Sequence, residues 1–219
     1  MLRTDPPDGY ASISLVDISY LGVGADPAGD RRLLDAPLLP FDGMNERGLA
    51  IGLAADDGAR ADPVPGRTTV GSVRIQRLVL DRAATVDEAV AVFRRHNLDF
   101  SGGPPLHYLI ADATGASAVV EFVDGRMRVE QGHTAWRALT NEPVVGVPEQ
   151  RRRADHRYGR IAAALDGAGG AVDVAAAARL LTEVRQAHTR WSVGYDLRGG
   201  EIRLTTAAGG ARAYRVSTA

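Results

Sequence analysis

The chain has 219 residues, the length of one globular domain, which we place at residues 1–219. An apolar share of 45% and a charged share of 24% exclude a disordered chain, and a net charge of −1 gives no electrostatic basis for a nucleic-acid or membrane partner. No Cys is present, which excludes disulfides, zinc-thiolate sites, iron-sulfur clusters and a thiol nucleophile within these residues.

The first half of the chain predicts two strands followed by two helices. Short apolar or alternating runs predict strands at residues 11–16 and 49–55, and the turn-forming Asp, Gly and Asn at 42–45 predict a turn between them. A surface loop is expected at residues 56–66. The helices are predicted at residues 71–82 and 86–96, and the second begins with a capping box made by Thr85 and Glu88.

The second half predicts hairpins, then helices, then a last group of strands. Hairpin-type turns are expected at residues 112–115, 124–125 and 198–200, and Asp173 is expected to cap the last helix. Strands followed by helices and more strands indicate the α+β class rather than a βαβ alternation. The strands are predicted at residues 106–111, 118–123, 126–130, 137–140, 192–197, 201–205 and 211–216, and the helices at 149–165 and 174–187.

Several phrases occur in one order along nearly the whole chain. They are RTDPPDGYAS at residues 3–12, FDGMNERGL at 41–49, LHYLIADATG at 106–115, AVVEF at 118–122, LTNEP at 139–143, Arg157-Tyr158 and Trp191-Ser192. Each phrase is weak alone, and their shared order carries the argument. In this order the sequence resembles the linear-amide C–N hydrolases, the relatives of penicillin V acylase, bile salt hydrolase and acyl-CoA:isopenicillin N acyltransferase.

The resemblance implies a fold and a nucleophile. The fold is the four-layer αββα sandwich of two antiparallel sheets found in N-terminal nucleophile hydrolases. In the family an N-terminal Cys attacks an amide carbonyl, and its own α-amine serves as the base. That Cys strand and the strand after it would both lie before Met1, so we expect the sandwich to miss its first strands.

The resemblance also implies three site residues, each with a plainer alternative. Asn141 matches the family Asn that donates a hydrogen bond to the oxyanion; alternatively it only satisfies a turn before Pro143. Asn45 belongs to the recognition motif and is assigned to substrate binding, or else it holds the turn before the next strand. Arg157 matches the Arg that orients the nucleophile and the substrate, or it belongs to a solvated basic helix face with Arg151, Arg152, Arg153 and Arg160.

One position departs from the family pattern. In the bile-salt-hydrolase branch a second oxyanion Asn falls where this chain has Ala55. A methyl side chain cannot donate a hydrogen bond, although a backbone N–H could substitute.

Other residues give no further chemistry. Asp56 and Asp57 are expected in a solvated turn, while Trp136 and Trp191 are expected in packing. No metal ligand set and no cofactor motif is found, and exposed or hydrogen-bonded His is expected at His96, His107, His133, His156 and His188.

The expected partner is a small-molecule acyl amide, with a homo-oligomer as the one protein partner considered. The sequence has neither a signal-peptide pattern nor an apolar run of about eighteen residues, so we expect a cytoplasmic protein without a membrane segment.

Four hypotheses account for a family member without Cys. The polypeptide starts upstream and this chain alone is inert, or a second polypeptide supplies the Cys strands. Alternatively, the chain is a non-catalytic descendant that binds a ligand or a protein, or Thr4 serves as the nucleophile after removal of three residues.

Overall fold

The computed structural model describes residues 1–24, 26–207 and 210–216. Its largest unit is a seven-stranded antiparallel sheet in the order β1-β2-β3-β4-β7-β8-β9. These strands are β1 (Leu2–Thr4), β2 (Ser12–Leu15), β3 (Asp42–Asn45), β4 (Ala50–Ala55), β7 (Leu106–Ala111), β8 (Ser117–Val123) and β9 (Arg126–Gly132). A three-stranded antiparallel sheet contains β10 (Trp191–Tyr195), β11 (Glu201–Thr206) and β12 (Ala211–Arg215), and β5 (Thr68–Gly71) pairs in parallel with β6 (His96–Asp99).

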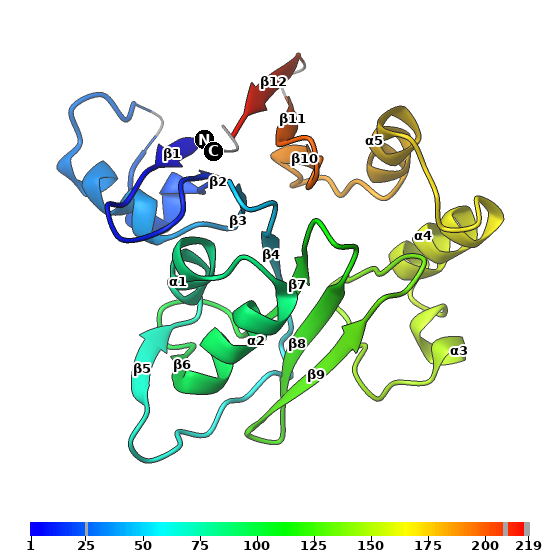
Figure 1. Ribbon diagram of the computed structural model, residues 1–219, viewed down its shortest axis with the longest axis horizontal. Coiled ribbons are helices and arrows are strands. Elements are labelled where there is room, and N and C mark those ends of the chain that lie inside the picture. Colours follow the sequence, from blue (N-terminus) through cyan, green and yellow to red (C-terminus); the bar gives the residue numbers. More distant parts are fainter. Residues whose placement is uncertain (25, 208–209, 217–219) are drawn as a thin grey trace.

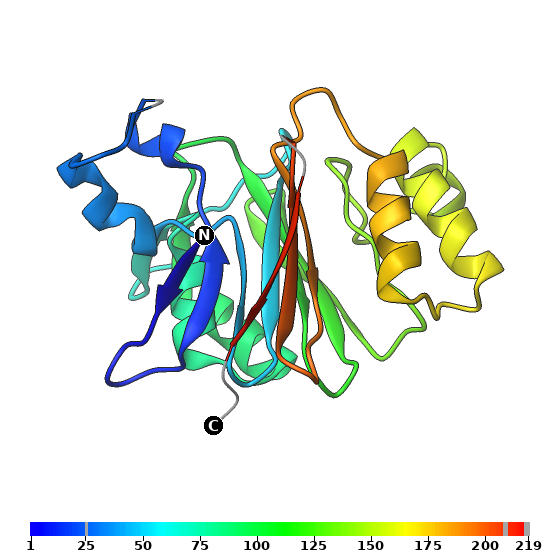
Figure 2. The same cartoon turned by 90° about the horizontal axis from the view of Figure 1, so that it is seen from above.

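Helices lie on both outer sides of the two antiparallel sheets (Figures 1 and 2). On the side of the seven-stranded sheet are α1 (Ile75–Arg82) and α2 (Val86–Arg95), and beyond the three-stranded sheet are α4 (His156–Gly167) and α5 (Val174–Glu183). A short helix, α3 (Glu149–Arg152), precedes α4, and two 3-10 helices, η1 (Ile18–Leu21) and η2 (Arg31–Leu38), follow β2.

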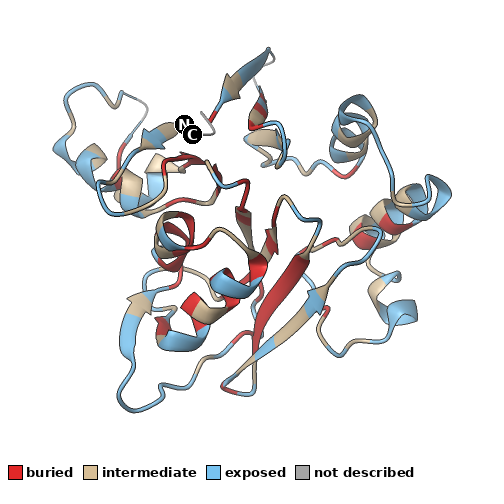
Figure 3. Ribbon diagram, in the orientation of Figure 1, coloured by how far each residue is buried: buried red, intermediate tan, exposed pale blue. Residues whose placement is uncertain are grey.

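The main core lies between the seven-stranded sheet and the helices α1 and α2 (Figure 3). Successive side chains of a strand point to opposite faces, so alternate residues of β4, β7 and β8 reach this core. Tyr108 from β7 packs on Phe93 of α2 with 4.8 Å between the ring centroids, and both are almost fully buried.

The opposite face of the seven-stranded sheet has two smaller clusters. Met44 and Ile13 pack against Ile202 of the three-stranded sheet, and Val119 packs against Tyr158 and neighbours from α4. The three-stranded sheet leaves β10 and β12 as edges within the described residues, and α5 has no buried residue (Figure 3).

Most predicted elements are confirmed, and so is the α+β class with antiparallel sheets. Thr85 accepts a hydrogen bond from the Glu88 backbone, and the Glu88 carboxylate accepts one from Ala84, which forms the capping interaction expected at α2. Asp173 caps α5 as predicted. The turns at 112–115 and 124–125 join β7 to β8 and β8 to β9, and Asp124 and Gly125 both have positive φ, as a tight hairpin requires.

The predicted turn at residues 42–45 is wrong. These residues form β3, because they pair with β2 on one side and β4 on the other. The turn lies a few residues later, where Gly48 has φ +73°. Pairing on both sides outweighs the local turn preference of Asp and Asn.

Two other predictions need correction. Residues 137–140 form no strand, and the carbonyl of Thr140 contacts the His107 ring instead of a neighbouring strand. The single helix expected at 149–165 is divided into α3 and α4, because Asp155 is extended and caps a new helix through the Tyr158 N–H.

Candidate functional site

Asn141 and Arg157, which lie 16 residues apart in the chain, meet at the end of strand β4. The Asn141 Nδ2 donates to the Ala55 carbonyl at 3.0 Å, and the Arg157 Nη1 donates to the Asn141 Oδ1 at 2.9 Å. The structure therefore brings together both predicted catalytic residues and the position at which the sequence departs from the family. Their catalytic roles stay predictions.

The hydrogen bonds fix the orientation of the Asn141 amide. Its oxygen faces the Arg157 guanidinium, which is only a donor, and its nitrogen faces a carbonyl, which is only an acceptor. A flipped amide would place donor against donor and acceptor against acceptor. One of the two Nδ2 hydrogens remains available on the exposed side chain.

Asp155 connects the loop before α4 to the first turn of that helix. Its carboxylate accepts from the Tyr158 N–H at 2.7 Å and from the Thr140 hydroxyl at 3.2 Å. Because Arg157 is the second residue of α4, this cap holds it beside Asn141, which directly follows Thr140. The Arg157 Nε is buried and has no hydrogen-bond partner.

Asn45 lies elsewhere, buried at the turn after β3 with 1% of its surface exposed. Its amide nitrogen donates to the carbonyls of Leu80 and Ala83, and its oxygen accepts from the backbone N–H groups of Arg47 and Leu49. These bonds support the turn-holding alternative. Substrate binding by Asn45 stays a prediction.

A buried polar cluster behind Asn141 escaped the sequence analysis. His107 and Glu121 lie opposite each other on β7 and β8, both with 0% exposure, and the His107 Nδ1 is 3.2 Å from the Glu121 Oε1. The other ring nitrogen of His107 contacts the Thr140 carbonyl at 2.7 Å. The Glu121 carboxylate accepts from the N–H groups of Val144 and Val145. Strand alternation could have indicated that both side chains share one face, but not what they meet there.

Asp56 belongs to the edge of this cluster, which corrects its assignment to a solvated turn. Its side chain is 4% exposed and its Oδ2 lies 3.9 Å from the His107 Nδ1. Burial raises the pKa of Asp56, although the charge of His107 opposes that effect.

A half-buried carboxylate joins the two antiparallel sheets. Asp42 on β3 accepts from the Trp191 indole N–H at 2.9 Å and from the Tyr195 hydroxyl, both on β10. Burial raises the pKa of Asp42 to about 6, while the hydrogen bonds from Tyr195 and Trp191 lower it. The predicted packing role of Trp191 thus includes a polar contact.

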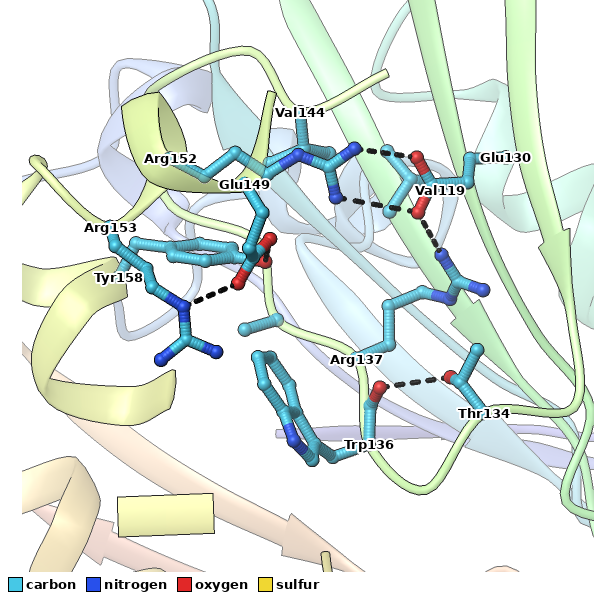
Figure 4. Close-up of a pocket in the computed structure, with 11 residues that line it drawn as sticks. Val119, Glu130, Thr134, Trp136, Arg137, Val144, Glu149, Arg152, Arg153 and Tyr158 are labelled. Atoms are coloured by element: carbon cyan, nitrogen blue, oxygen red, sulfur yellow. Dashed lines mark hydrogen bonds and ion pairs between the residues drawn. The ribbon is translucent and has the colours of Figure 1, made fainter. Parts of the chain in front are cut away.

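A pocket of about 320 Å³ lies between β9 and helices α3 and α4 (Figure 4). Arg152 and Arg137 both donate to Glu130, and Arg153 pairs with Glu149. Other lining residues include Thr134, Trp136, Ala138, Val119, Val144 and Tyr158. The pocket is lined by the aromatic rings of Trp136 and Tyr158 and by ion-paired Arg and Glu side chains. Neither Asn141 nor Arg157 lines it.

The described residues contain no group of three or more His, Asp or Glu side chains arranged to hold a metal ion. Within the same residues, no helix is both long and apolar enough to cross a bilayer. The cellular compartment stays a prediction.

A family model for the linear amide C-N hydrolases, choloylglycine hydrolase family, matches residues 17–147. The penicillin V acylase of Pectobacterium atrosepticum is 29% identical over 114 residues, which represent 47% of this chain and 30% of that protein. The match thus spans less than a third of that relative's length.

Solved structures share the fold. Penicillin V acylase from Agrobacterium tumefaciens is 21% identical with a TM-score of 0.63, covering 82% of this chain and 67% of the other. A variant of the conjugated bile acid hydrolase from Clostridium perfringens is 18% identical with a TM-score of 0.64, covering 81% of this chain and 73% of the other.

Proposed function

We infer the function from one premise: this chain belongs to the choloylglycine hydrolase family of linear amide C-N hydrolases. We propose that its residues form the oxyanion-binding and substrate-orienting part of an amidase or acyltransferase site. The substrate is a small molecule with a linear acyl amide, such as a penicillin V-like amide, an N-acyl amino acid or a conjugated bile salt. No cofactor is required by this chemistry.

The contact between Arg157 and Asn141 carries the proposal. Arg157 fixes the amide so that Nδ2 points away from the guanidinium, and one Nδ2 hydrogen stays free for an oxyanion. In the described residues Arg157 has no ion pair that would already use its charge.

The nucleophile in this proposal comes from residues outside the 219, since these contain no Cys. We propose that the fold is a four-layer αββα sandwich whose second sheet lacks its first strands, and that the Cys strand pairs with the free edge of β10. The short second sheet and the open edge support this assignment.

Within that site, the chain's own residues would perform two steps. Asn141 would stabilise the negative oxygen that forms when the thiol attacks the amide carbonyl, and Arg157 would hold Asn141 and orient the substrate. The 219 residues alone would be inert. Whether water or an amine accepts the acyl group depends on parts of the site that these residues do not supply.

The genomic DNA tests this proposal first. An uninterrupted reading frame upstream of Met1 that encodes Cys-Thr or Cys-Ser, followed by Gly-Arg-Asn-x-Asp, is the expected result. The longer product should then release amine from one of the three substrate types. An immediate in-frame stop codon would contradict an upstream Cys and favour a split enzyme or a non-catalytic protein.

A ligand-binding or protein-interaction descendant is the second candidate, favoured by the pocket between β9 and α3. Calorimetric titration of the chain with penicillin V separates the two functions. The enzyme proposal expects weak binding that Asn141→Ala reduces further. Tight binding that Asn141→Ala leaves unchanged, but Arg152→Ala removes, would instead support ligand binding in that pocket.

A further inference from the structure

The buried His107 has an oxygen acceptor at each ring nitrogen. Its Nε2 is 2.7 Å from the Thr140 carbonyl, and its Nδ1 is 3.2 Å from the Glu121 carboxylate. A carbonyl oxygen can only accept, so Nε2 must carry a hydrogen. A hydrogen on Nδ1 as well would make the ring an imidazolium, whereas a neutral ring would face Glu121 with a lone pair.

The state of Glu121 decides between these two forms. Burial alone would raise the pKa of Glu121, yet hydrogen bonds from His107, Val144 and Val145 outweigh it, and the pKa lies below the ordinary value. Both carboxylate oxygens already accept backbone N–H groups, at 2.8 and 2.9 Å. An ionised Glu121 requires a donor at Nδ1 of the ring.

The surrounding charges are compatible with a positive ring. Asp56, which follows β4, lies 3.9 Å from Nδ1. Asp155, the N-cap of α4, accepts a hydrogen bond from the hydroxyl of Thr140, the residue whose carbonyl contacts the ring. The one basic neighbour on the facing strand is Arg128, the cross-strand partner of Glu121, and it is exposed to solvent. The carboxylates of Glu121 and Asp56 are thus the two that lie next to the ring.

We propose that His107 is a positioning residue, which together with Glu121 clamps residues 139–145 to the seven-stranded sheet and so sets the orientation of Asn141. The clamp has three points, at the Thr140 carbonyl and at the N–H groups of Val144 and Val145, and they bracket Asn141 in the chain. The relevance of this clamp to catalysis rests on the oxyanion role proposed for Asn141. The clamp itself does not depend on that role.

Charge-assisted hydrogen bonds explain why this pair can hold the loop. Such bonds are stronger than neutral ones, and a buried partner left unpaired is costly. Each end of the loop is also tied elsewhere: Thr140 to Asp155, and Asn141 to the Ala55 carbonyl. Loss of the His107 or Glu121 side chain should therefore turn the loop about these two contacts and change the environment of the Asn141 amide.

Nitrogen NMR of the complete chain tests the proposal without any assay of activity. In the wild-type chain the backbone N–H groups of Val144 and Val145 should be protected from hydrogen exchange, and the Asn141 side-chain NH₂ should give one pair of resonances. A simple packing role of His107 would not link the Asn141 side-chain resonances to the His107 and Glu121 side chains.

Two variants sharpen the test. His107→Gln and Glu121→Gln should each reduce the protection of Val144 and Val145 by roughly tenfold to a hundredfold, as expected for a lost charge-assisted bond. His96→Gln is the matched control, since His96 is partly buried and contacts the Val92 carbonyl through Nδ1. It should leave all these signals unchanged.

The proposal is overturned if the protection of Val144 and Val145 is unchanged in Glu121→Gln. It is also overturned if the Asn141 resonances are the same in wild type and His107→Gln. Failure of the enzyme proposal gives a different pattern, in which the clamp behaves as expected but the upstream-extended chain releases no amine.

Discussion

The two faces of the seven-stranded sheet are covered to very different degrees. Against one face, α1, α2 and neighbouring segments form a cluster of 19 buried apolar residues within the described chain. Against the other lie two smaller clusters of described buried residues, one of four that includes the three-stranded sheet and one of five that includes α4. Helix α5, beyond that second sheet, has an apolar sequence and buries none of its residues.

Residues of this chain pack one face of the sheet with a large core, and they pack the other face only with small clusters. The completed face is a packed core in which the Thr85 side chain caps α2. On the other face, Tyr158 of α4 packs on Val119, and the preceding residue, Arg157, contacts Asn141. The candidate site thus lies on the face with the smaller clusters of buried residues.

The largest effect is expected from the completed core. Phe93→Ala should lower the free energy of unfolding by about 3–5 kcal/mol, because it leaves a cavity beside Tyr108. Leu181→Ala on α5, where Leu181 is 39% exposed, should change it by less than about 0.5 kcal/mol. Urea unfolding measures both, and equal losses would contradict the contrast between the two faces.

A glycine at the junction of the two faces should give the next effect. Gly48 has φ +73°, and a Cβ there would lie 2.1 Å from the Leu197 carbonyl oxygen, so Gly48→Ala should cost roughly 2–4 kcal/mol. Gly115→Ala is the matched control, with φ +91° and no atom within 4 Å. The difference between their thermal midpoints measures the clash alone, and similar midpoints would refute it.

The pH dependence of Asp42 tests the contact between the sheets. Its pKa of about 6 in the folded chain lies above the ordinary 3.8, so the folded chain takes up a proton more readily than the unfolded chain between these values. Asp42 therefore contributes stability that is complete below about pH 4 and is lost as the pH rises through about 6. The contribution is at most roughly 3 kcal/mol.

Asp42→Asn isolates this contribution, because it removes the titration and keeps the shape. The difference in unfolding free energy between wild type and the variant should change between pH 4 and pH 7 in the direction stated. A difference that is constant with pH would show that Asp42 has the same proton affinity in both states.

The smallest effect is expected at the cap of α5. Asp173→Ala removes the hydrogen bond to Ala176 and should cost about 1 kcal/mol or less, as local fraying seen by hydrogen exchange. Asp155→Ala removes the cap of α4 and the bond to Thr140, so it should cost more and also shift the Arg157 resonances. Similar behaviour of the two variants would mean that α4 is no better anchored than α5.

The sequence predicts local structure well where local signals are strong. The Thr85 cap of α2 and the tight turn at Asp124 and Gly125 depend on neighbouring residues alone, and both are present, although Glu88 accepts from Ala84 rather than from Thr85 as a capping box requires. The turn expected at 42–45 is wrong because strand pairing on both sides, which is not local, outweighs the preference of Asp and Asn.

The candidate site shows the same division. Asn141 and Arg157 could be selected from the resemblance, but their contact with Ala55 depends on a loop crossing to β4. The pair of His107 and Glu121 was missed because it needs the register of β7 and β8, which the residues do not reveal by themselves.

The most direct test of the account is amine release from penicillin V, a conjugated bile salt and an N-acyl amino acid. The 219 residues alone should release none, and the product extended upstream through its Cys should release amine from at least one. Asn141→Ala should reduce that rate by roughly 10²- to 10³-fold, while Glu142→Ala, the adjacent exposed position, should not. Turnover by the 219 residues alone, abolished by Asn141→Ala, would contradict the claim that the nucleophile lies outside them.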